Sequence, residues 1–334
     1  MTTDAPWIAA QCAQLLASPG QALLLQGPSG LGQYALALAL ARAWLCEKPG
    51  PQGACGACAS CHAIDVRTHA DLHVLMPEVE MMSLGWPLAE KAQAEIDDKK
   101  RKASKEIRVD AMRDAIEFSQ RTSARGRSKV VLVYPAEQMN TITANALLKT
   151  LEEPPGAVRF VLASASAHQL LPTIRSRCLG HSMQWPDRAT GLAWLVAQGL
   201  EPALALQLLR MSGDRPEDAL ARAQEGMPPD MWQQFPRAMQ QGNVALVRDW
   251  SAVLLLDALQ KLCHDAMVRQ TGAAPRFFDV AALQCLGPLA WGALARWSAD
   301  LRAACRTAEH PFNPGLMQEA LVEQAKNALN SVRT

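Results

Sequence analysis

The first half of the chain carries two kinds of apolar pattern in alternation. Short and almost uninterrupted apolar runs occupy residues 22–26, 129–134 and 159–163. Segments with helical apolar spacing occupy residues 7–17, 33–45 and 141–151. Uninterrupted runs are typical of strands that are buried on both faces of a sheet. Because such strands alternate here with helices, we predict an α/β fold with a parallel sheet between helices.

The pattern changes after residue 187, from where only helical spacing and turn signals occur. Helical apolar spacing is clearest at residues 252–267 and 316–329. We therefore predict three domains, with bounds at residues 1–187, 188–227 and 228–334. The first is the α/β domain, the second a small helical domain and the third a larger all-α domain. A charge-rich segment at residues 78–106 interrupts the first domain, and we interpret it as a solvated helical or partly disordered insertion. A basic arm is the alternative interpretation.

Composition and charge narrow the classes of function. The chain has 334 residues, 49% of them hydrophobic, and 33 Lys plus Arg against 32 Asp plus Glu give a net charge of +1. Such a balance argues against nucleic-acid binding driven by bulk charge alone, although a local basic patch can act within an assembly. The N-terminus lacks the positive start of a signal peptide, and Pro and Gly interrupt the uncharged stretch 5–41. We expect a cytoplasmic protein without a membrane partner.

A glycine-rich turn follows the first predicted strand. Gly27 and Gly32 have the spacing of a phosphate-binding P-loop, G-x-x-x-x-G-K-[ST], between a strand and a helix. The Lys position holds Gln33 and the Ser/Thr position holds Tyr34. The missing Lys would have neutralised the terminal phosphates, and the missing hydroxyl would have held Mg²⁺. On the turn alone, a degenerate nucleotide site and an ordinary glycine-rich turn remain equally open.

The acid that completes a working nucleotide site is also missing. An apolar strand that ends in Asp supplies this metal ligand, whereas the run at residues 129–133 is followed by Tyr134 and Pro135. Glu137 lies beyond the proline and is a poor substitute. We therefore expect no ATP hydrolysis at this site.

Four cysteines lie close together after the predicted helix at residues 33–45. They are Cys46, Cys55, Cys58 and Cys61, in the spacing C-x8-C-x2-C-x2-C. Four thiolates complete a tetrahedral zinc site, which is then structural because no position is open to substrate. We predict zinc as a structural cofactor of a module at residues 46–61. His62 could replace one cysteine, and incidental buried cysteines are the other alternative.

Three segments in order carry a family resemblance. They are ANALLKTLEEPP at residues 144–155, RFVLAS at 159–164 and LLPTIRSRC at 170–178. This set closely resembles the AAA+ clamp-loader subunits of bacteria. The resemblance implies an AAA+ P-loop domain with a zinc-binding insert, followed by a helical lid domain and an all-α collar. It also implies a subunit of a hetero-pentamer, within the DNA polymerase III holoenzyme, that loads the sliding clamp onto primed DNA.

The family contains subunits of three types. Gamma/tau hydrolyses ATP, and delta opens the clamp but generally lacks the SRC motif and the zinc module. A third type keeps both features and has a degenerate nucleotide site, which is the pattern of this chain. The resemblance therefore implies gamma/tau and delta as partners. Residues 212–220 resemble the sensor-2 region of the lid, with Glu217 where an ATPase has Arg, or Arg215 in that place under a shifted alignment.

Arg177 is the residue that the resemblance assigns to chemistry. In clamp loaders the SRC arginine reaches the ATP of the neighbouring subunit, so Arg177 is the expected arginine finger in trans. The alternatives are a surface arginine that caps the preceding helix, and Arg175 in the same role. For the whole chain the alternatives are an active ATPase with atypical residues and an independent zinc-dependent DNA-binding module. Arg121, Arg125, Arg127 and Lys129 form a basic cluster that is either a solvated strand entry or a DNA contact.

Overall fold

The chain divides into two compact units, residues 1–190 and 191–334. The computed structural model describes residues 5–18, 20–224, 229–308, 310 and 313–331. The predicted boundary at residues 227 and 228 lies outside the described residues, so the three-domain division stays a prediction. Among the helices that the structure describes, none is both long enough and apolar enough to cross a bilayer.

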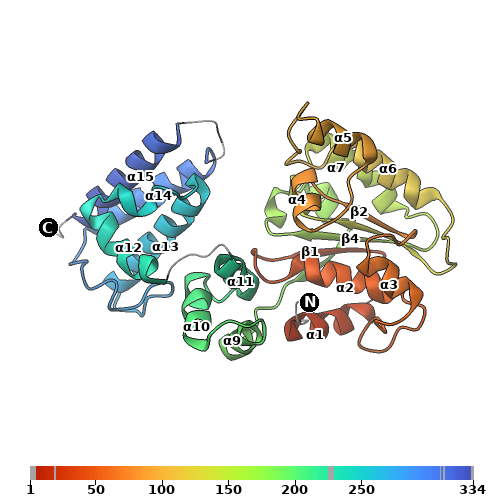
Figure 1. Cartoon of the computed structure of the whole chain (residues 1–334), viewed down its shortest axis with the longest axis horizontal. Helices are drawn as coiled ribbons and strands as arrows, with labels where there is room; N and C mark the ends of the chain where they lie inside the picture. The colour runs from red at the N-terminus through yellow and green to blue at the C-terminus, as the bar shows by residue number, and fades with distance from the viewer. Residues whose placement is uncertain (1–4, 19, 225–228, 309, 311–312, 332–334) are drawn as a thin grey trace. The chain divides into compact units, whose positions relative to one another are not determined.

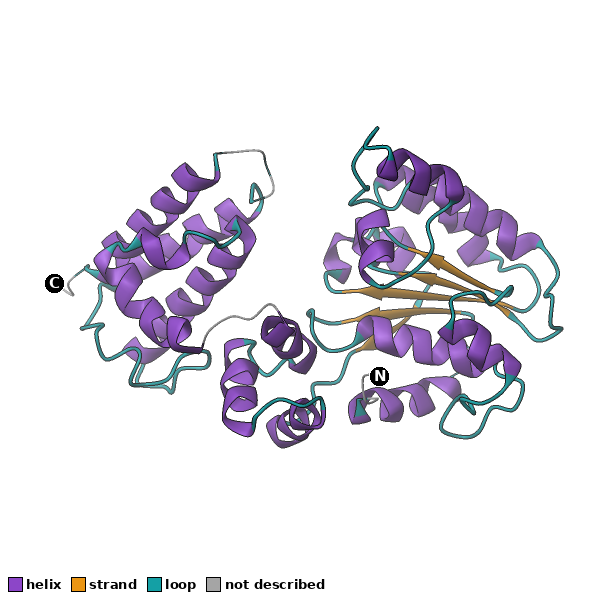
Figure 2. Cartoon of the chain, viewed as in Figure 1, coloured by secondary structure: helices purple, strands orange, loops and turns teal. Residues whose placement is uncertain are grey.

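The first unit is built on a parallel sheet of five strands in the order β2-β3-β4-β1-β5 (Figure 2). The strands are β1 (Ala22–Gln26), β2 (Leu72–Leu75), β3 (Lys129–Val133), β4 (Val158–Ser164) and β5 (Leu179–Ser182). The central strands β1, β3 and β4 are almost wholly buried, which their apolar runs predict. The predicted α/β fold is confirmed, and β2 and β5 are added at its two edges.

Helices cover both faces of this sheet (Figure 1). Helices α1 (Pro6–Leu16), α2 (Gln33–Leu45) and α3 (Ala59–Asp65) lie on one face. Helices α6 (Val109–Gln120), α7 (Thr141–Glu152) and α8 (Pro172–Arg175) lie on the other. The main apolar core packs residues of α6 and α7, such as Met112 and Leu147, against Val131 and Phe160 of the sheet. The sheet thereby positions the residues that follow its strands, which include the glycine-rich turn after β1 and Tyr134 after β3.

The charged insertion is folded and is attached to the domain. It contains α4 (Glu78–Ser83) and α5 (Glu90–Asp97). The buried carboxylate of Glu78 accepts a hydrogen bond of 2.7 Å from Arg101 and one of 2.8 Å from the backbone N–H of Ser104. Arg101 also bonds Glu95 at 2.8 Å. The two helices confirm that the segment is helical in part. Because several of its charged side chains pair with one another, the segment is neither wholly solvated nor a free basic arm.

Among its described residues, the second unit contains helices joined by turns and loops, and no β-strand. Its helices are α9 (Arg188–Ala197), α10 (Pro202–Met211), α11 (Pro216–Gln224), α12 (Pro229–Gln241), α13 (Ala252–Gln270), α14 (Trp291–Cys305) and α15 (Pro314–Leu329). Stacked aromatic rings form its core, with Trp232 and Phe278 only 4.4 Å apart and Phe235 packed between Trp232 and Trp250. Trp194 and Trp297 are also buried, whereas Trp291 is exposed.

Candidate functional site

The glycine-rich turn has the expected position between β1 and α2. Its backbone enters the left-handed region at Gly30 (φ 78°) and Gly32 (φ 91°), a conformation that favours glycine. At Gly27 an added Cβ would lie 2.9 Å from Cβ of Met183. Close packing and backbone conformation thus account for glycine at these positions whether or not a phosphate binds.

Gln33 turns its side chain back onto the turn itself. Its Nε2 donates hydrogen bonds to the backbone carbonyls of Gly27 at 2.6 Å and Pro28 at 2.7 Å. The residue is only 5% exposed. The neutral amide of Gln33 therefore bonds the backbone of the turn. A working site has a lysine at this position, and its cation reaches the phosphates.

Three aromatic side chains, Tyr34, Tyr134 and Trp86, form a group that we call the aromatic cluster, and the two tyrosines stand at the sequence positions of the two missing metal ligands. Tyr34 and Tyr134 have ring centroids 5.4 Å apart. Trp86, from the insertion, donates its Nε1–H to the hydroxyl of Tyr34 at 2.7 Å. The guanidinium of Arg67 lies 4.5 Å above the Trp86 ring. Burial raises the pKa of Tyr34, so the cluster presents no anion to a metal ion at neutral pH.

Glu137, the nearest carboxylate in sequence, serves the next strand. Its Oε1 accepts a hydrogen bond of 3.0 Å from the backbone N–H of Ala165, just after β4. The carboxylate therefore fixes a loop of the domain, which agrees with the expectation that it does not replace the missing acid.

Arg177 lies just beyond α8 with its side chain 30% exposed. Its Nε donates to Oε1 of Glu152 at 2.8 Å, and its Nη2 bonds the same oxygen. Its Nη1 donates to the backbone carbonyl of Thr173 at 2.8 Å, which is the helix-capping contact of the alternative interpretation. Arg175 makes no side-chain hydrogen bond within the part of the chain that the structure describes. The two arginines of the motif thus differ, since only Arg177 is held in one orientation.

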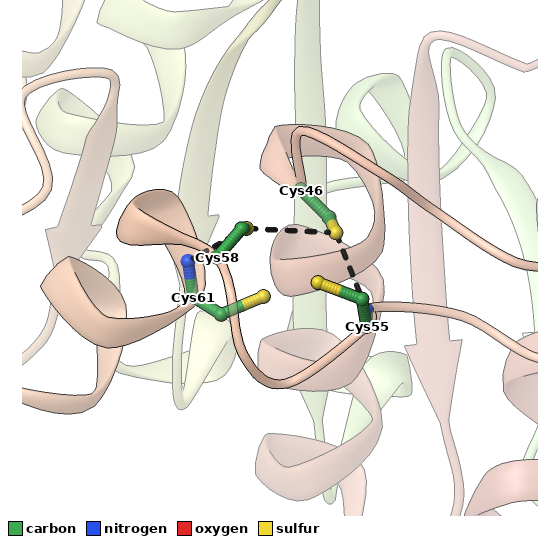
Figure 3. A group of neighbouring side chains, drawn as sticks. All are labelled: Cys46, Cys55, Cys58 and Cys61. Carbon is green, nitrogen blue, oxygen red and sulfur yellow. Dashed lines mark hydrogen bonds between the residues drawn. The ribbon is translucent and has the colours of Figure 1, made fainter.

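The four predicted cysteines come together after α2 (Figure 3). Cys46 ends α2 and Cys58 caps α3, so two helices fix two of the sulfurs. All four sulfurs lie within 4.8 Å of one another, and those of Cys46 and Cys58 are 3.8 Å apart. A tetrahedral zinc with Zn–S bonds of about 2.3 Å needs sulfurs about 3.8 Å apart. The donor set and its spacing fit a structural zinc, and His62 is not part of the group.

The sequence itself has relatives of established name. The family model described as DNA polymerase III, delta subunit, matches residues 16–186. The DNA polymerase III subunit delta' of Escherichia coli is 32% identical over 277 residues, which cover 77% of this chain and 76% of the relative. This chain belongs to the delta-prime family of DNA polymerase III subunits. The third type of clamp-loader subunit, predicted from the degenerate site, the SRC motif and the four cysteines, is delta-prime, so that prediction is confirmed.

A second relative agrees with this family. The DNA polymerase III subunit delta' of Pseudomonas aeruginosa is 42% identical over 216 residues, which cover 63% of this chain and 58% of the relative. The matched region thus spans less than two thirds of that protein. A solved DNA polymerase III gamma subunit-related protein from Thermotoga maritima aligns over 97% of this chain and 100% of its own length, with a TM-score of 0.49 and 16% identity. A likeness at that level carries no inference about activity.

The basic cluster of this delta-prime family member is paired internally. Arg125 bonds the carboxylate of Glu47 at 3.0 Å, and Arg127 donates to the Glu47 backbone carbonyl at 2.9 Å. Lys129 is buried, 3.8 Å from Asp71, and Arg121 pairs with Glu117 one helical turn away. Arg125 and Arg127 therefore bind the cysteine module to the sheet, and Lys129 is not part of a solvated strand entry.

The segment at residues 212–220 lies between α10 and α11 and includes the first turns of α11. Arg215 pairs with Asp218 at 2.9 Å and donates to the carbonyl of Ser212 at 2.8 Å, so its guanidinium links the end of α10 to the first turn of α11. Burial, with a further contribution from the charge of Asp218, raises the pKa of Glu217 to about 7.

Two contributors to these sites were not predicted from the sequence. Trp86 lies in the charged segment at residues 78–106, whose many charges do not suggest a buried aromatic residue. Glu152 is part of the family motif at residues 144–155, but the motif does not indicate its contact with Arg177. A large aromatic residue among charged ones is a signal that could have drawn attention to Trp86. The partner of Arg177, 25 positions away, leaves no signal in a single sequence.

Proposed function

We propose that this chain is the non-hydrolysing stator of a bacterial clamp loader. In this proposal it joins gamma/tau and delta subunits in a cytoplasmic hetero-pentamer that places the sliding clamp on primed DNA. It hydrolyses no ATP itself and completes a neighbouring gamma/tau site with Arg177. The proposal extends family membership to activity and partners.

The observation that carries the proposal is the state of the nucleotide cleft. Gln33 bonds the carbonyls of the glycine-rich turn, and Tyr34 and Tyr134 contact each other where a hydroxyl and an acid would hold Mg²⁺. Three separate requirements of phosphoryl transfer are therefore missing at once. The alternative, an active ATPase with atypical residues, would need a cation and a metal ligand from elsewhere in the chain.

Arg177 supports the second half of the proposal. It keeps a charged guanidinium at the surface of a domain whose own cleft holds no cation at Gln33. An arginine delivered to a neighbour's ATP stabilises the charge on the transferring phosphoryl group and is worth about 10³–10⁵ in rate. Such a role requires a guanidinium that a neighbouring subunit can reach, and the side chain of Arg177 is 30% exposed.

The four cysteines are proposed to hold zinc in a structural role. Cys46, Cys55, Cys58 and Cys61 are its ligands, and the metal would supply no chemistry beyond tying together a segment with little apolar core. Arg125 and Glu47 then transmit this order to the loop that precedes β3.

The test is Arg177→Ala in a loader reconstituted with gamma/tau, delta, clamp and primed DNA. We expect ATP turnover at the site that Arg177 serves to fall by about 10³-fold. Arg175→Ala is the matched control, because it removes an arginine from the same motif without removing a fixed side chain. Unchanged turnover and clamp loading in the Arg177 variant would refute the proposal. Turnover of ATP by the isolated chain would instead favour the active-ATPase alternative.

A further inference from the structure

The bonds of Arg177 leave little of its guanidinium available. Nε and Nη2 both donate to Oε1 of Glu152, and Nη1 donates to the carbonyl of Thr173 and to the hydroxyl of Ser176 at 3.3 Å. A guanidinium has five N–H groups in a planar fork. These four bonds leave a single N–H, on Nη2, for any other acceptor.

The edge of the guanidinium that faces Glu152 is one that a phosphate needs. Arginine binds carboxylates and phosphates alike through two neighbouring N–H groups, and the pair on Nε and Nη2 is one such edge. In this chain a carboxylate oxygen of Glu152 already accepts from that pair. Arg177 therefore cannot present this edge to a phosphate without first leaving Glu152.

The position of Glu152 is not explained by the stability of its helix. It is the last residue of α7, where the helix dipole disfavours a carboxylate. Its side chain is 49% exposed, so the pair with Arg177 contributes little to folding. The next residue, Glu153, has the same charge and is exposed, yet it has no ion-pair partner within the described residues. The contact thus singles out Glu152.

We propose that Glu152 is a positioning residue that holds Arg177 in a withdrawn orientation and competes for it with the phosphate of the neighbour's ATP. This inference rests on the proposed function of Arg177. In this proposal the bond to Thr173 is kept when Arg177 engages the ATP. The negative charge of Glu152 is then replaced by that of the phosphate. Binding of ATP at the neighbouring site then includes the cost of breaking the Glu152 contact. Exposed ion pairs of this kind correspond to at most about a fivefold change in an equilibrium constant.

The experiment compares Glu152→Gln, Glu152→Ala and the matched control Glu153→Gln in the reconstituted loader, with kcat and KM for ATP measured separately. Removing the competing charge is expected to lower KM by about three- to fivefold and to leave kcat within about twofold. The control is expected to match the wild type. In the double variant with Arg177→Ala, the effect of Glu152→Gln should disappear.

The outcomes separate this inference from the function on which it rests. An unchanged KM in the Glu152 variants, while Arg177→Ala lowers turnover, overturns the competition and leaves the arginine finger intact. A fall in kcat as large as that of Arg177→Ala also overturns it, because Glu152 would then be needed in the engaged state. If Arg177→Ala has no effect on turnover, the proposed function fails first.

Discussion

Two regions of the first unit correspond to the ATP chemistry of this family, and they have opposite characters. In the nucleotide cleft, Gln33 and the aromatic cluster are packed and bonded within the domain. At the surface after α8, Arg177 is charged and exposed and is paired with an exposed carboxylate. The first region lacks the Lys, the Ser/Thr and the acid of a working nucleotide site, while the second holds the arginine that we propose acts on a neighbour's ATP.

We interpret this difference as one between side chains that serve the fold and a side chain that is proposed to serve a partner. Trp86, 8% exposed, stabilises the domain through burial and through its bond to Tyr34. The ion pair of Arg177 is worth at most about 1 kcal/mol at such exposure, so it contributes little to folding. Changes in the cleft should therefore affect stability, and changes at Arg177 should affect turnover in the assembly.

The largest effect on stability is expected at the cysteine module. Like the nucleotide cleft, this module is expected to stabilise the fold. Replacing Cys58 by Ser should abolish binding of one zinc per chain and unfold the module, since structural zinc contributes about 10–16 kcal/mol of apparent binding free energy in zinc-finger peptides. Metal analysis and thermal unfolding measure both effects. Cys305→Ser, at an exposed cysteine outside the group, is the control. If the purified chain carried no zinc and still folded normally, the cysteine module would not stabilise the fold through a metal.

The next largest effect is expected at Trp86. Replacing it by Ala should lower the free energy of unfolding by about 3–5 kcal/mol, because a buried indole is lost. The hydroxyl of Tyr34 also loses its donor. Replacing Trp86 by Phe keeps most of the ring and should cost roughly 1 kcal/mol through the missing hydrogen bond. Denaturant unfolding followed by circular dichroism distinguishes the two variants. A loss below 1 kcal/mol for the Ala variant would mean that the cluster does not stabilise the cleft.

Much of the first unit could be predicted from the sequence because its signals are local. Strand β1 and helix α2 begin and end where their apolar patterns do, and the cysteines lie within 16 consecutive residues that two helices fold together. Strands β2 and β5 were missed because each has only four residues with polar positions among them. Pairing with a neighbouring strand, and not local propensity, makes these segments extended.

The contacts that define the two compared regions could not be predicted in this way. Trp86 and Tyr34 are 52 positions apart, and Glu152 and Arg177 are 25 apart. Such contacts depend on how the insertion and the end of α7 pack against the sheet. The sequence could indicate which groups of the nucleotide site are missing, but not which side chains take their place.

A smaller effect on stability is expected at Arg177. This prediction tests whether the second region contributes little to folding. Arg177→Ala should change the free energy of unfolding by less than about 1 kcal/mol, while turnover in the loader falls. Arg101→Ala is the matched control, because it removes a partner of the buried carboxylate of Glu78 and should cost about 1–3 kcal/mol. If Arg177→Ala destabilised the chain as much as Arg101→Ala does, Arg177 would belong with the side chains that stabilise the fold.

The smallest effect is expected at Tyr34 and depends on pH. Burial raises the pKa of its phenol in the folded chain, while hydrogen bonding from Trp86 and the charge of Arg67 act in the opposite direction. An acid with a raised folded-state pKa binds its proton more tightly in the folded state, so its contribution is complete below the unfolded pKa of about 10 and is lost as pH rises through the folded value. The free energy of unfolding should therefore decline above pH 10, and less steeply for Tyr34→Phe. Equal slopes in denaturant unfolding between about pH 9 and 11 would show that the hydroxyl is solvated and that the cluster is looser than its contacts with Trp86 and Tyr134 imply.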